Sequence, residues 1–403
     1  MPAAPLTTPT RQARLARAAV AALFLTNGAV FFNIVPRYPQ IKAELGLSNA
    51  VFGTALAAHP VGALLAGLLA GAAIRRFRSA RVASMGIVVT TLATLFIPFV
   101  PNWVAFGGVL FVVGALDAIV DVAQNAHGLR VQRLYGRSIV NSLHGVWSVG
   151  AVLGGLMGSA AAGLDIPLAV HLGISATLFS VTALVAYRFL LPGPEDAERP
   201  AEAQDGDTSR RAGRRTFTGA AVRMLAALGV LAACGTLVED AGASWGALYL
   251  SGDLRTDAAT AGLAVVALQV AMTVGRLSGD RVVDRFGQRT VVRAGGALAA
   301  IGMGAALAMP SVPAALAGFA LAGLGVATLV PAAMHTADEL PGLPAGAGLT
   351  IVSWLLRGGF LLSPPLVGFV ADLTSLRVGL LSVVLAGTVT VVLGRVLVNR
   401  TPA

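Results

Sequence analysis

The chain is dominated by apolar runs that are long enough to cross a bilayer. A membrane-spanning helix needs about 20 consecutive, mostly apolar residues. Runs of this length recur at 18–36, 51–74, 82–100, 103–127, 138–163, 167–191, 220–250, 257–281, 290–309, 313–335, 346–370 and 376–398. The pattern predicts an all-α integral membrane protein with twelve transmembrane helices.

One extended hydrophilic stretch interrupts this pattern. It reads PGPEDAERPAEAQDGDTSRRAGRR at 192–215, and its Pro, Gly and mixed charge are typical of a flexible linker. It leaves six runs on either side. We therefore expect five parts in chain order. They are a short cytoplasmic N-terminal lead (1–17), a six-helix bundle (18–191), a cytoplasmic linker (192–219), a second six-helix bundle (220–398) and a cytoplasmic tail (399–403). No small-residue cleavage site followed by a soluble domain comes after the first run, so this run is interpreted as a spanning helix.

The composition supports a membrane protein. Hydrophobic residues make up 56% of the 403 residues and charged residues 12%, whereas soluble domains are about 45–50% apolar and about 25% charged. A mean hydropathy of +0.78 over the whole chain exceeds what a soluble core requires. The single cysteine, Cys234, excludes an internal disulfide and says nothing about the redox compartment.

The basic residues are distributed unevenly between the two sides of the membrane. The net charge is +10, and 24 of the 29 Lys and Arg residues fall in the terminal segments, the linker and the turns on the same side. Because positively charged loops stay on the cytoplasmic side, this side is expected to be cytoplasmic, with both termini. The basic excess is then a topology signal, and we expect no nucleic-acid partner.

The two halves resemble each other in sequence. Two stretches, SLHGVWSVGAVLGG (142–155) and LLRGGFLLSPPLVG (355–368), each have a basic residue directly before a glycine. In both, an aromatic residue follows three positions after the basic residue. AIRRFRSAR (73–81) and VVDRFGQR (282–289) share an Arg-Phe step in the turns after spans two and eight. Parallel repeats of this kind place a substrate path between two pseudo-symmetric bundles.

The stretch GRLSGDRVVDRFGQR (275–289), together with the twelve spans and the basic central loop, resembles the major facilitator superfamily. That family has a Gly-x-x-x-Asp-Arg-x-Gly-Arg-Arg-like loop after span two, often repeated after span eight. The resemblance implies the MFS fold and a gating loop made of Asp284, Arg285, Gly287 and Arg289. The corresponding loop of the first half, GAAIRRFRSAR, has Arg75 in place of the family's acid.

A narrower resemblance covers nearly the whole chain. It is to the branch that includes the membrane protein of rhizopine clusters, distantly akin to the fucose:proton symporters. It rests on VPRYPQIKAELGLS (35–48), DVAQNAHGLRVQRLYGR (121–137), SLHGVWSVGAVLGG, EDAGASWGALYL (239–250) and SPPLVGF (363–369). The branch usually has an acid directly before the tryptophan of the fourth stretch, where this chain has Ser244.

The polar residues of span four are the main candidates for function. Asp117, Asp121 and Gln124 have i, i+4, i+7 spacing and form one stripe, with Asn125 beside it. A charge at mid-bilayer costs at least about 2.5–3.5 kcal/mol, so the stripe must face the bundle interior or a water-filled path.

Three interpretations of this stripe remain open. The acids are structural and pair with Arg130, Arg133 or His144, or one of them carries the coupling proton, because desolvation favours the neutral form of a carboxyl group. For the proton role, the family resemblance favours Asp121 and greater depth favours Asp117. A Mg²⁺ site of a membrane prenyltransferase is the third interpretation, and no second Asp-x-x-x-Asp stretch inside a span supports it.

Other polar residues at membrane depth are also candidates. Arg357 lies within span eleven, and we expect it to pair with Glu239 or Asp240 or to contact the substrate. His144 is a hydrogen-bonding residue or a proton relay. For Trp245 and Tyr249, an interfacial aromatic belt competes with stacking against a sugar-like ring. The candidates for proton coupling are Asp121, Asp117, Glu239 and His144. The candidates for the substrate cavity are Asn27, Gln124, Asn125, Trp147, Asp240, Trp245, Gln269, Trp354 and Arg357.

From the sequence and the resemblance we expect a secondary active transporter, not an enzyme. It would move a small polar organic solute, sugar-like or related, across the cytoplasmic membrane by alternating access with proton coupling. A drug or metabolite exporter of the same fold and a non-transporting membrane sensor are the alternatives. We expect a monomer in the lipid bilayer, with no cofactor or metal. No nucleotide-binding loop is recognisable in the sequence.

The arginine asymmetry gives a topology prediction. Reporters fused to either terminus, or inserted within 192–215, should all report a cytoplasmic location, because few basic residues favour the opposite orientation. Paired alkaline phosphatase and fluorescent protein fusions measure this directly. A periplasmic signal at any of the three positions would rule out the twelve-span topology.

Overall fold

The computed structural model describes residues 10–135, 139–193, 219–340 and 347–397, and these are almost entirely helical. Twelve helical stretches among them are long and apolar enough to cross a membrane, so the prediction of twelve transmembrane helices is confirmed. The elements of the first half are α1 (Arg11–Ile34), η1 (Val35–Arg37), α2 (Tyr38–Glu44), α3 (Asn49–Leu56), α4 (Ala58–Gly67), α5 (Ala70–Phe77), α6 (Ser79–Thr94), η2 (Ile97–Phe99), α7 (Trp103–Tyr135), α8 (Val140–Gly163) and α9 (Leu168–Tyr187).

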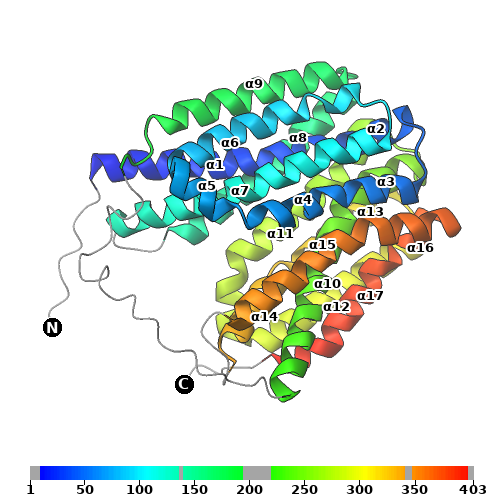
Figure 1. The fold of residues 1–403 in the computed structure, drawn as a ribbon. Coiled ribbons are helices and arrows are strands. Elements are labelled where there is room, and N and C mark those ends of the chain that lie inside the picture. The colour runs from blue at the N-terminus through cyan, green and yellow to red at the C-terminus, as the bar shows by residue number, and fades with distance from the viewer. Residues whose placement is uncertain (1–9, 136–138, 194–218, 341–346, 398–403) are drawn as a thin grey trace.

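The second half repeats this organisation. Its elements are α10 (Gly219–Gly252), α11 (Ala258–Phe286), α12 (Gln288–Ala308), α13 (Val312–Val326), α14 (Leu329–Asp338), α15 (Ala347–Leu373), α16 (Leu376–Gly379), α17 (Leu381–Leu393) and η4 (Gly394–Val396). The two halves form two bundles, which meet at the end of the molecule away from the termini and diverge toward the termini (Figure 1). Contacts between bundles are made mainly by α8 with α11 and by α3 with α15.

The first helix begins earlier than its apolar run. It starts at Arg11, about two turns before the predicted span at 18–36, and the Thr10 hydroxyl caps it by accepting a hydrogen bond from the Ala13 N–H (3.2 Å). Part of the expected lead at 1–17 is therefore helical. Hydropathy does not identify this first part of the helix, because its arginines lie where the helix leaves the hydrocarbon. The start of the helix is marked instead by its N-cap, which is a local signal independent of hydropathy.

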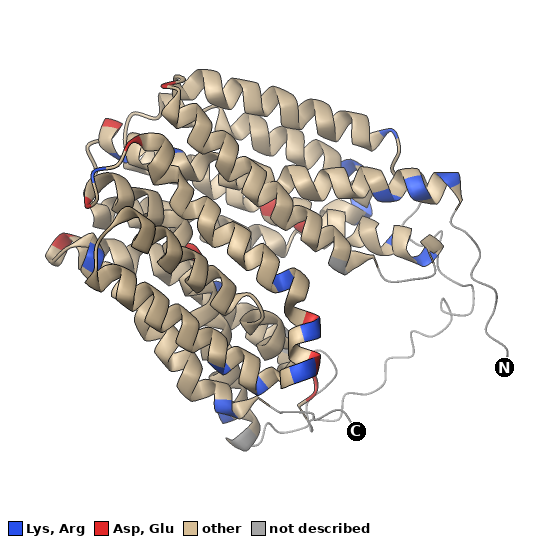
Figure 2. Cartoon of the chain, turned by 180° about the vertical axis from the view of Figure 1, so that it is seen from behind, with Lys and Arg blue, Asp and Glu red and all other residues tan. Residues whose placement is uncertain are grey.

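The charged groups follow the predicted asymmetry. Figure 2 shows most Lys and Arg residues of the described chain near the side where both termini lie. The long helices between are almost free of charge, in keeping with an apolar surrounding.

The backbone shows the internal repeat at the turns after α5 and α11. Arg78 ends α5 with φ 72° and ψ 148°, and Gly287 ends α11 with φ 79° and ψ 145°. Each donates its N–H four residues back, to Ile74 O (2.7 Å) and to Val283 O (2.8 Å) respectively. The two turns have the same geometry, although one uses arginine where the other uses glycine.

Close packing of α1 against α8 organises the first bundle. A Cβ atom added at Gly150 would overlap the Leu25 carbonyl oxygen, and one at Gly154 would overlap the Ala29 carbonyl oxygen. The glycines of α8 thus let the backbones of α1 and α8 touch. Inside lipid no hydrophobic effect drives helices together, so van der Waals contact of this kind stabilises the pair.

This packing predicts the effect of a single side chain. Gly150→Val should force α1 and α8 apart and lower the stability of the first bundle by roughly 1–3 kcal/mol. Gly173→Val in α9 is the matched control, because nothing lies within 4 Å of a Cβ at that position. Thermal unfolding in detergent is the measurement. Equal melting temperatures for the two variants would show that the α1–α8 contact is not tight.

Candidate functional site between the two bundles

A chain of polar side chains links α7 to α8 in the first bundle. The Asn125 amide nitrogen donates to Asp121 Oδ1 (3.0 Å), and its Oδ1 lies 3.1 Å from His144 Nε2. Since a side-chain amide oxygen only accepts, His144 carries a proton on Nε2. Asp121 is exposed although it lies in a spanning helix. The carboxylate, amide and imidazole thus form one connected network.

The remaining candidates of the first bundle surround this network. Asp117 is half-buried, with Asn27 of α1 within hydrogen-bonding reach. Gln124 is fully buried, beside Asp121. Trp147 packs edge-on against Phe32 with ring centroids 6.1 Å apart. Of the expected partners of the α7 acids, His144 is connected through Asn125, whereas Arg130 donates to the Pro192 carbonyl (2.9 Å).

The second bundle presents an ion pair to the same region. Arg276 of α11 donates to Glu239 of α10, with Nη2 to Oε2 at 3.2 Å. Next to Glu239, the Asp240 carboxyl accepts from Ser244 Oγ at Oδ1 (3.2 Å), and its buried Oδ2 has no hydrogen-bond partner among the described residues. The hydroxyl of Ser244 thus supports Asp240, at the position where the resembling branch has an acid.

Charged groups of the two bundles face each other. Asp121 is attracted electrostatically to Arg357 of α15, whereas a protonated His144 is repelled by Arg276 of α11. Both interactions act between one bundle and the other. Electrostatic interactions of either sign are stronger than in bulk water when the dielectric constant of the surroundings is low. The arrangement can therefore bind a polar molecule between the bundles or transmit a change of charge from one to the other.

The expected pairing of Arg357 with Glu239 or Asp240 is not found. Glu239 is paired with Arg276, and Arg357 is exposed with no hydrogen-bond partner among the described residues. Trp354, one turn before it, is also exposed. Arg357 lies within a spanning helix, as the sequence indicates, but the sequence does not show that Arg276 of α11 pairs with Glu239.

The burial of two aromatic residues of α10 excludes one of the two interpretations offered for them. Trp245 and Tyr249 are fully buried, so the interfacial belt is wrong as an explanation. The Trp245 ring contacts Phe52 of α3 edge-on (centroids 6.1 Å apart) and lies between Gly53 and Gly368. The reason is that this end of α10 packs against the other bundle and not against lipid. Gln269 of α11 is also buried, and both polar atoms of its amide lack a hydrogen-bond partner in the described chain.

The predicted gating loop lies on the side of the termini. Asp284 and Arg285 are exposed, and Arg289 donates to the Leu397 carbonyl (2.7 Å). Within the described ranges the Asp284 carboxylate has neither a hydrogen-bond nor an ion-pair partner. Gly287 supplies the left-handed turn. The loop is thus formed, while its acid is unengaged on the side where the bundles diverge.

A carboxylate closes the opposite side. Asp372, at the end of α15, accepts from the backbone N–H groups of Asn49 (2.9 Å) and Ala50 (2.8 Å) and so caps α3 of the other bundle. Lys42 adds an electrostatic attraction to the same carboxylate. Sequence reasoning missed Asp372 and Arg276, because a cap or ion pair between residues so distant in the chain leaves no local pattern.

Comparison with known proteins agrees with this architecture. The sequence profile of the Major Facilitator Superfamily matches residues 20–245 and 230–403. The membrane protein MosC of Rhizobium meliloti is 31% identical over 376 residues, which are 93% of this chain and 88% of that protein. An uncharacterized transporter of Sinorhizobium fredii is 28% identical over 378 residues, 94% of this chain and 97% of that protein.

Solved structures share the fold at low sequence identity. A bacterial homolog of the human lysosomal transporter Spinster, inward-facing and unoccupied, has a TM-score of 0.75 at 16% identity and covers 98% of this chain and 100% of its own. A mutant of the nucleoside transporter NupG has a TM-score of 0.74 at 13% identity, and the match covers 94% of this chain and 98% of the NupG chain. The transporter FucP in the outward conformation has a TM-score of 0.60 at 16% identity, with 96% and 99% covered.

The cap made by Asp372 gives a prediction about closure between the bundles. Removing an N-cap costs about 1 kcal/mol, so Asp372→Ala should raise the open population on this side about fivefold. A cysteine at Leu248, which lines the cavity of about 520 Å³ there, reports opening by its rate of maleimide labelling in a Cys234→Ser background.

Asp257→Ala is the matched control for this experiment. Asp257 also caps a helix near the same end, but it caps α11 within its own bundle, where it accepts from the Thr260 N–H (2.9 Å). Its loss should leave the labelling rate at position 248 unchanged. If both variants label equally fast, the cap on α3 does not hold the bundles together.

Proposed function

The chain belongs to the Major Facilitator Superfamily, and from this membership we propose that it is a secondary active transporter that moves a small polar organic solute by alternating access, coupled to protons. The observation that supports this proposal is the polar network between the bundles. Asp121, Asn125 and His144 lie on one side of it, and Arg276 and Arg357 on the other. The chain would act as a monomer in the cytoplasmic membrane, without enzymatic activity.

The arrangement of the bundles supports an inward-facing state. Asp372 and Trp245 join the bundles on the side away from the termini, and the ribbons diverge toward the termini (Figure 1). The arginine distribution favours a cytoplasmic location for the side of the termini. The TM-score is also higher with the inward-facing homolog of Spinster than with the outward structure of FucP. The proposed transport cycle would release the contacts of Asp372 and form new contacts on the cytoplasmic side.

The proposed proton coupling is supported by the charge that Asp121 places between the bundles. When this carboxylate is ionised, it attracts Arg357 of the opposite bundle, and protonation removes the attraction. Loading and release of a proton would therefore bias how closely the two bundles approach. His144, connected to Asp121 through Asn125, is positioned to relay the proton.

The substrate class is proposed from the side chains that face the interface. Amides, a histidine and two arginines suit a solute with several hydroxyl or carbonyl groups, and Trp147 and Trp354, which the sequence predicts as cavity residues, would provide aromatic faces for stacking on a ring. A sugar, a cyclic polyol or a nucleoside has this chemistry. The nucleoside transporter among the structural neighbours fits this range, although at 13% identity it supports only the fold.

The proposal is tested first by transport itself. Purified protein should be screened by ligand-induced thermal shift with fucose, myo-inositol, uridine, organic acids and drugs. Any solute that stabilises it is then offered in labelled form to proteoliposomes with an imposed proton gradient. Accumulation above the external concentration, abolished by a protonophore, is the expected result. Binding without flux would identify a sensor and overturn the transporter proposal.

The role of Asp121 is tested by an isosteric change. Asp121→Asn keeps the shape and hydrogen bonds but cannot titrate, so accumulation should be lost while exchange of the solute across the membrane persists. Asp117→Asn is the matched variant on the same stripe of α7 and should retain accumulation. The opposite pattern would assign the coupling to Asp117, and accumulation by both variants would show that the stripe is structural.

A further inference from the structure

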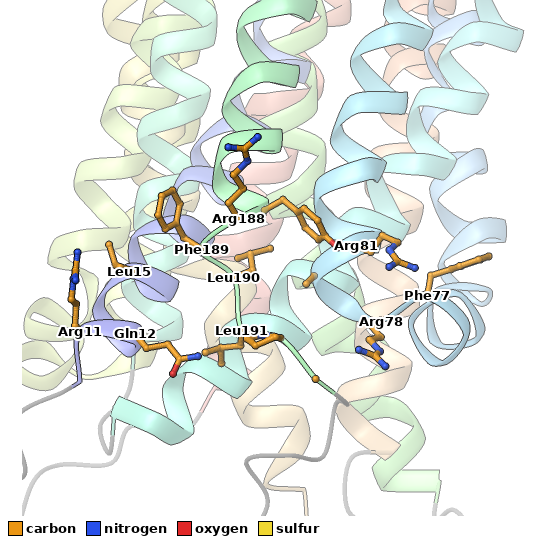
Figure 3. A pocket seen from close by; sticks show the side chains of 14 residues that line it. Arg11, Gln12, Leu15, Phe77, Arg78, Arg81, Arg188, Phe189, Leu190 and Leu191 are labelled. Atoms are coloured by element: carbon orange, nitrogen blue, oxygen red, sulfur yellow. The ribbon is translucent and has the colours of Figure 1, made fainter.

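A basic pocket lies outside the interface between the bundles. It has a volume of about 670 Å³ and lies at the terminal side of the first bundle, where the start of α1, the turn between α5 and α6 and the end of α9 meet. Figure 3 shows Arg11 on one side, Arg78 and Arg81 on the other, and residues 188–191 between them. It is lined by Arg11, Gln12, Leu15, Phe77, Arg78, Ala80, Arg81, Tyr187, Arg188, Phe189, Leu190, Leu191, Pro192 and Gly193.

The charge of this pocket is unbalanced. Four of the lining residues are arginines, Arg11, Arg78, Arg81 and Arg188, and none of the lining residues is acidic. In the described parts of the chain, none of the four has an ion-pair partner. Four like charges around one cavity repel one another, and an anion placed among them removes this cost and can accept charge-assisted hydrogen bonds.

Arg78 is held there in a strained backbone conformation. Its φ of 72° lies in the left-handed region, which disfavours residues with a Cβ atom. Gly287 occupies the equivalent turn of the second bundle without such strain. Where glycine would fit, the chain has a guanidinium group that lines the pocket. Strained residues of this kind cluster at binding sites, where the surrounding structure holds them.

The pocket also has an apolar side. Leu15, Phe77 and Phe189 line it and are exposed, and they belong to elements at the ends of spanning helices. Exposed apolar side chains next to arginines at this level match the boundary between headgroups and acyl chains. The ligand that fits both parts has an anionic head and a hydrocarbon tail.

The wall of the pocket is fixed by buried polar groups. The Leu191 N–H donates to His127 Nε2 (3.1 Å), and Arg130 donates to the Pro192 carbonyl (2.9 Å). His127 and Arg130 are both almost fully buried in α7. The segment that separates Arg11 from Arg78 is therefore anchored before any ligand binds.

We propose that this pocket binds the phosphate-bearing headgroup of an anionic phospholipid, with its acyl chains along Leu15, Phe77 and Phe189. The arginines contact the phosphate, and Arg78 is the residue whose strained position serves this contact. The second bundle has Asp284 and Gly287 in the equivalent turn, so the site belongs to the first bundle alone. The inference does not depend on the transported solute.

The experiment uses the purified full-length protein in detergent at constant ionic strength. Its thermal unfolding is titrated with dioctanoyl phosphatidylglycerol, with dioctanoyl phosphatidylcholine and with inorganic phosphate. Phosphatidylglycerol should raise the melting temperature saturably, and phosphatidylcholine should not. If phosphate alone gives the same shift at the same concentration, the site binds a soluble anion and the assignment to a lipid is overturned.

Arg78→Gly separates binding from folding, because its two expected effects have opposite signs. Without lipid the variant should melt at a higher temperature than the native protein, since glycine relieves the left-handed strain. Its affinity for phosphatidylglycerol should fall roughly fivefold, as expected for one arginine at a membrane surface. A stabilised variant that binds the lipid as tightly as the native protein would overturn the role of Arg78.

A matched pair of double variants tests the pocket as a whole. Arg81→Gln with Arg188→Gln removes two charges from the lining, and its lipid affinity should fall by more than tenfold. Arg14→Gln with Arg75→Gln removes two exposed charges on the same side that do not line the pocket. Equal losses of affinity in both double variants would show a diffuse electrostatic attraction and would overturn the proposed site.

Discussion

The structure depends on one constraint, which is that hydrocarbon offers no hydrogen bonds to a polar group. Each carboxylate, amide or guanidinium in a spanning helix must therefore find a partner inside the protein or face a polar path. Asp121, Asn125 and His144 satisfy this by joining one another. Arg276 and Glu239 do so on the opposite bundle. The polar groups gather between the bundles because the lipid-facing surfaces cannot hold them, and this concentration is what makes the interface a candidate site.

The same constraint explains which parts of the structure the sequence could predict. The number of spans follows from hydropathy, and the stripe of Asp117 and Asp121 follows from helical spacing, because both are local properties. Hydropathy cannot distinguish a helix face that meets lipid from one that meets another helix, so an interfacial belt was one of two interpretations of Trp245, which is buried between the bundles. Contacts such as that of Asp372 with the first turn of α3 join distant parts of the chain, and they become visible only when the helices are placed.

The two bundles share a backbone plan but differ in chemistry at equivalent positions. Both turns, at Arg78 and at Gly287, have the same dihedral angles and the same closing hydrogen bond. The second turn has an acid, Asp284, which is exposed. The first turn has Arg75 in place of that acid and an arginine in place of the glycine. The two copies of a duplicated fold can thus keep the same backbone turn while one presents an acid and the other lines a basic pocket.

The free energy of the contacts that hold the bundles together determines how large an effect one proton could have on their arrangement. A carboxylate cap such as that of Asp372 is worth about 1 kcal/mol, and two conformations of a protein commonly differ by a few kcal/mol. A contact of this size favours one conformation but leaves the other conformation populated. The attraction between Asp121 and Arg357 acts across the same two bundles, and a reduced dielectric constant near a protein surface strengthens it relative to bulk water. In the proposed cycle, gain or loss of one proton at Asp121 would therefore shift a balance of a few kcal/mol between two arrangements of the bundles, without any large rearrangement inside either bundle.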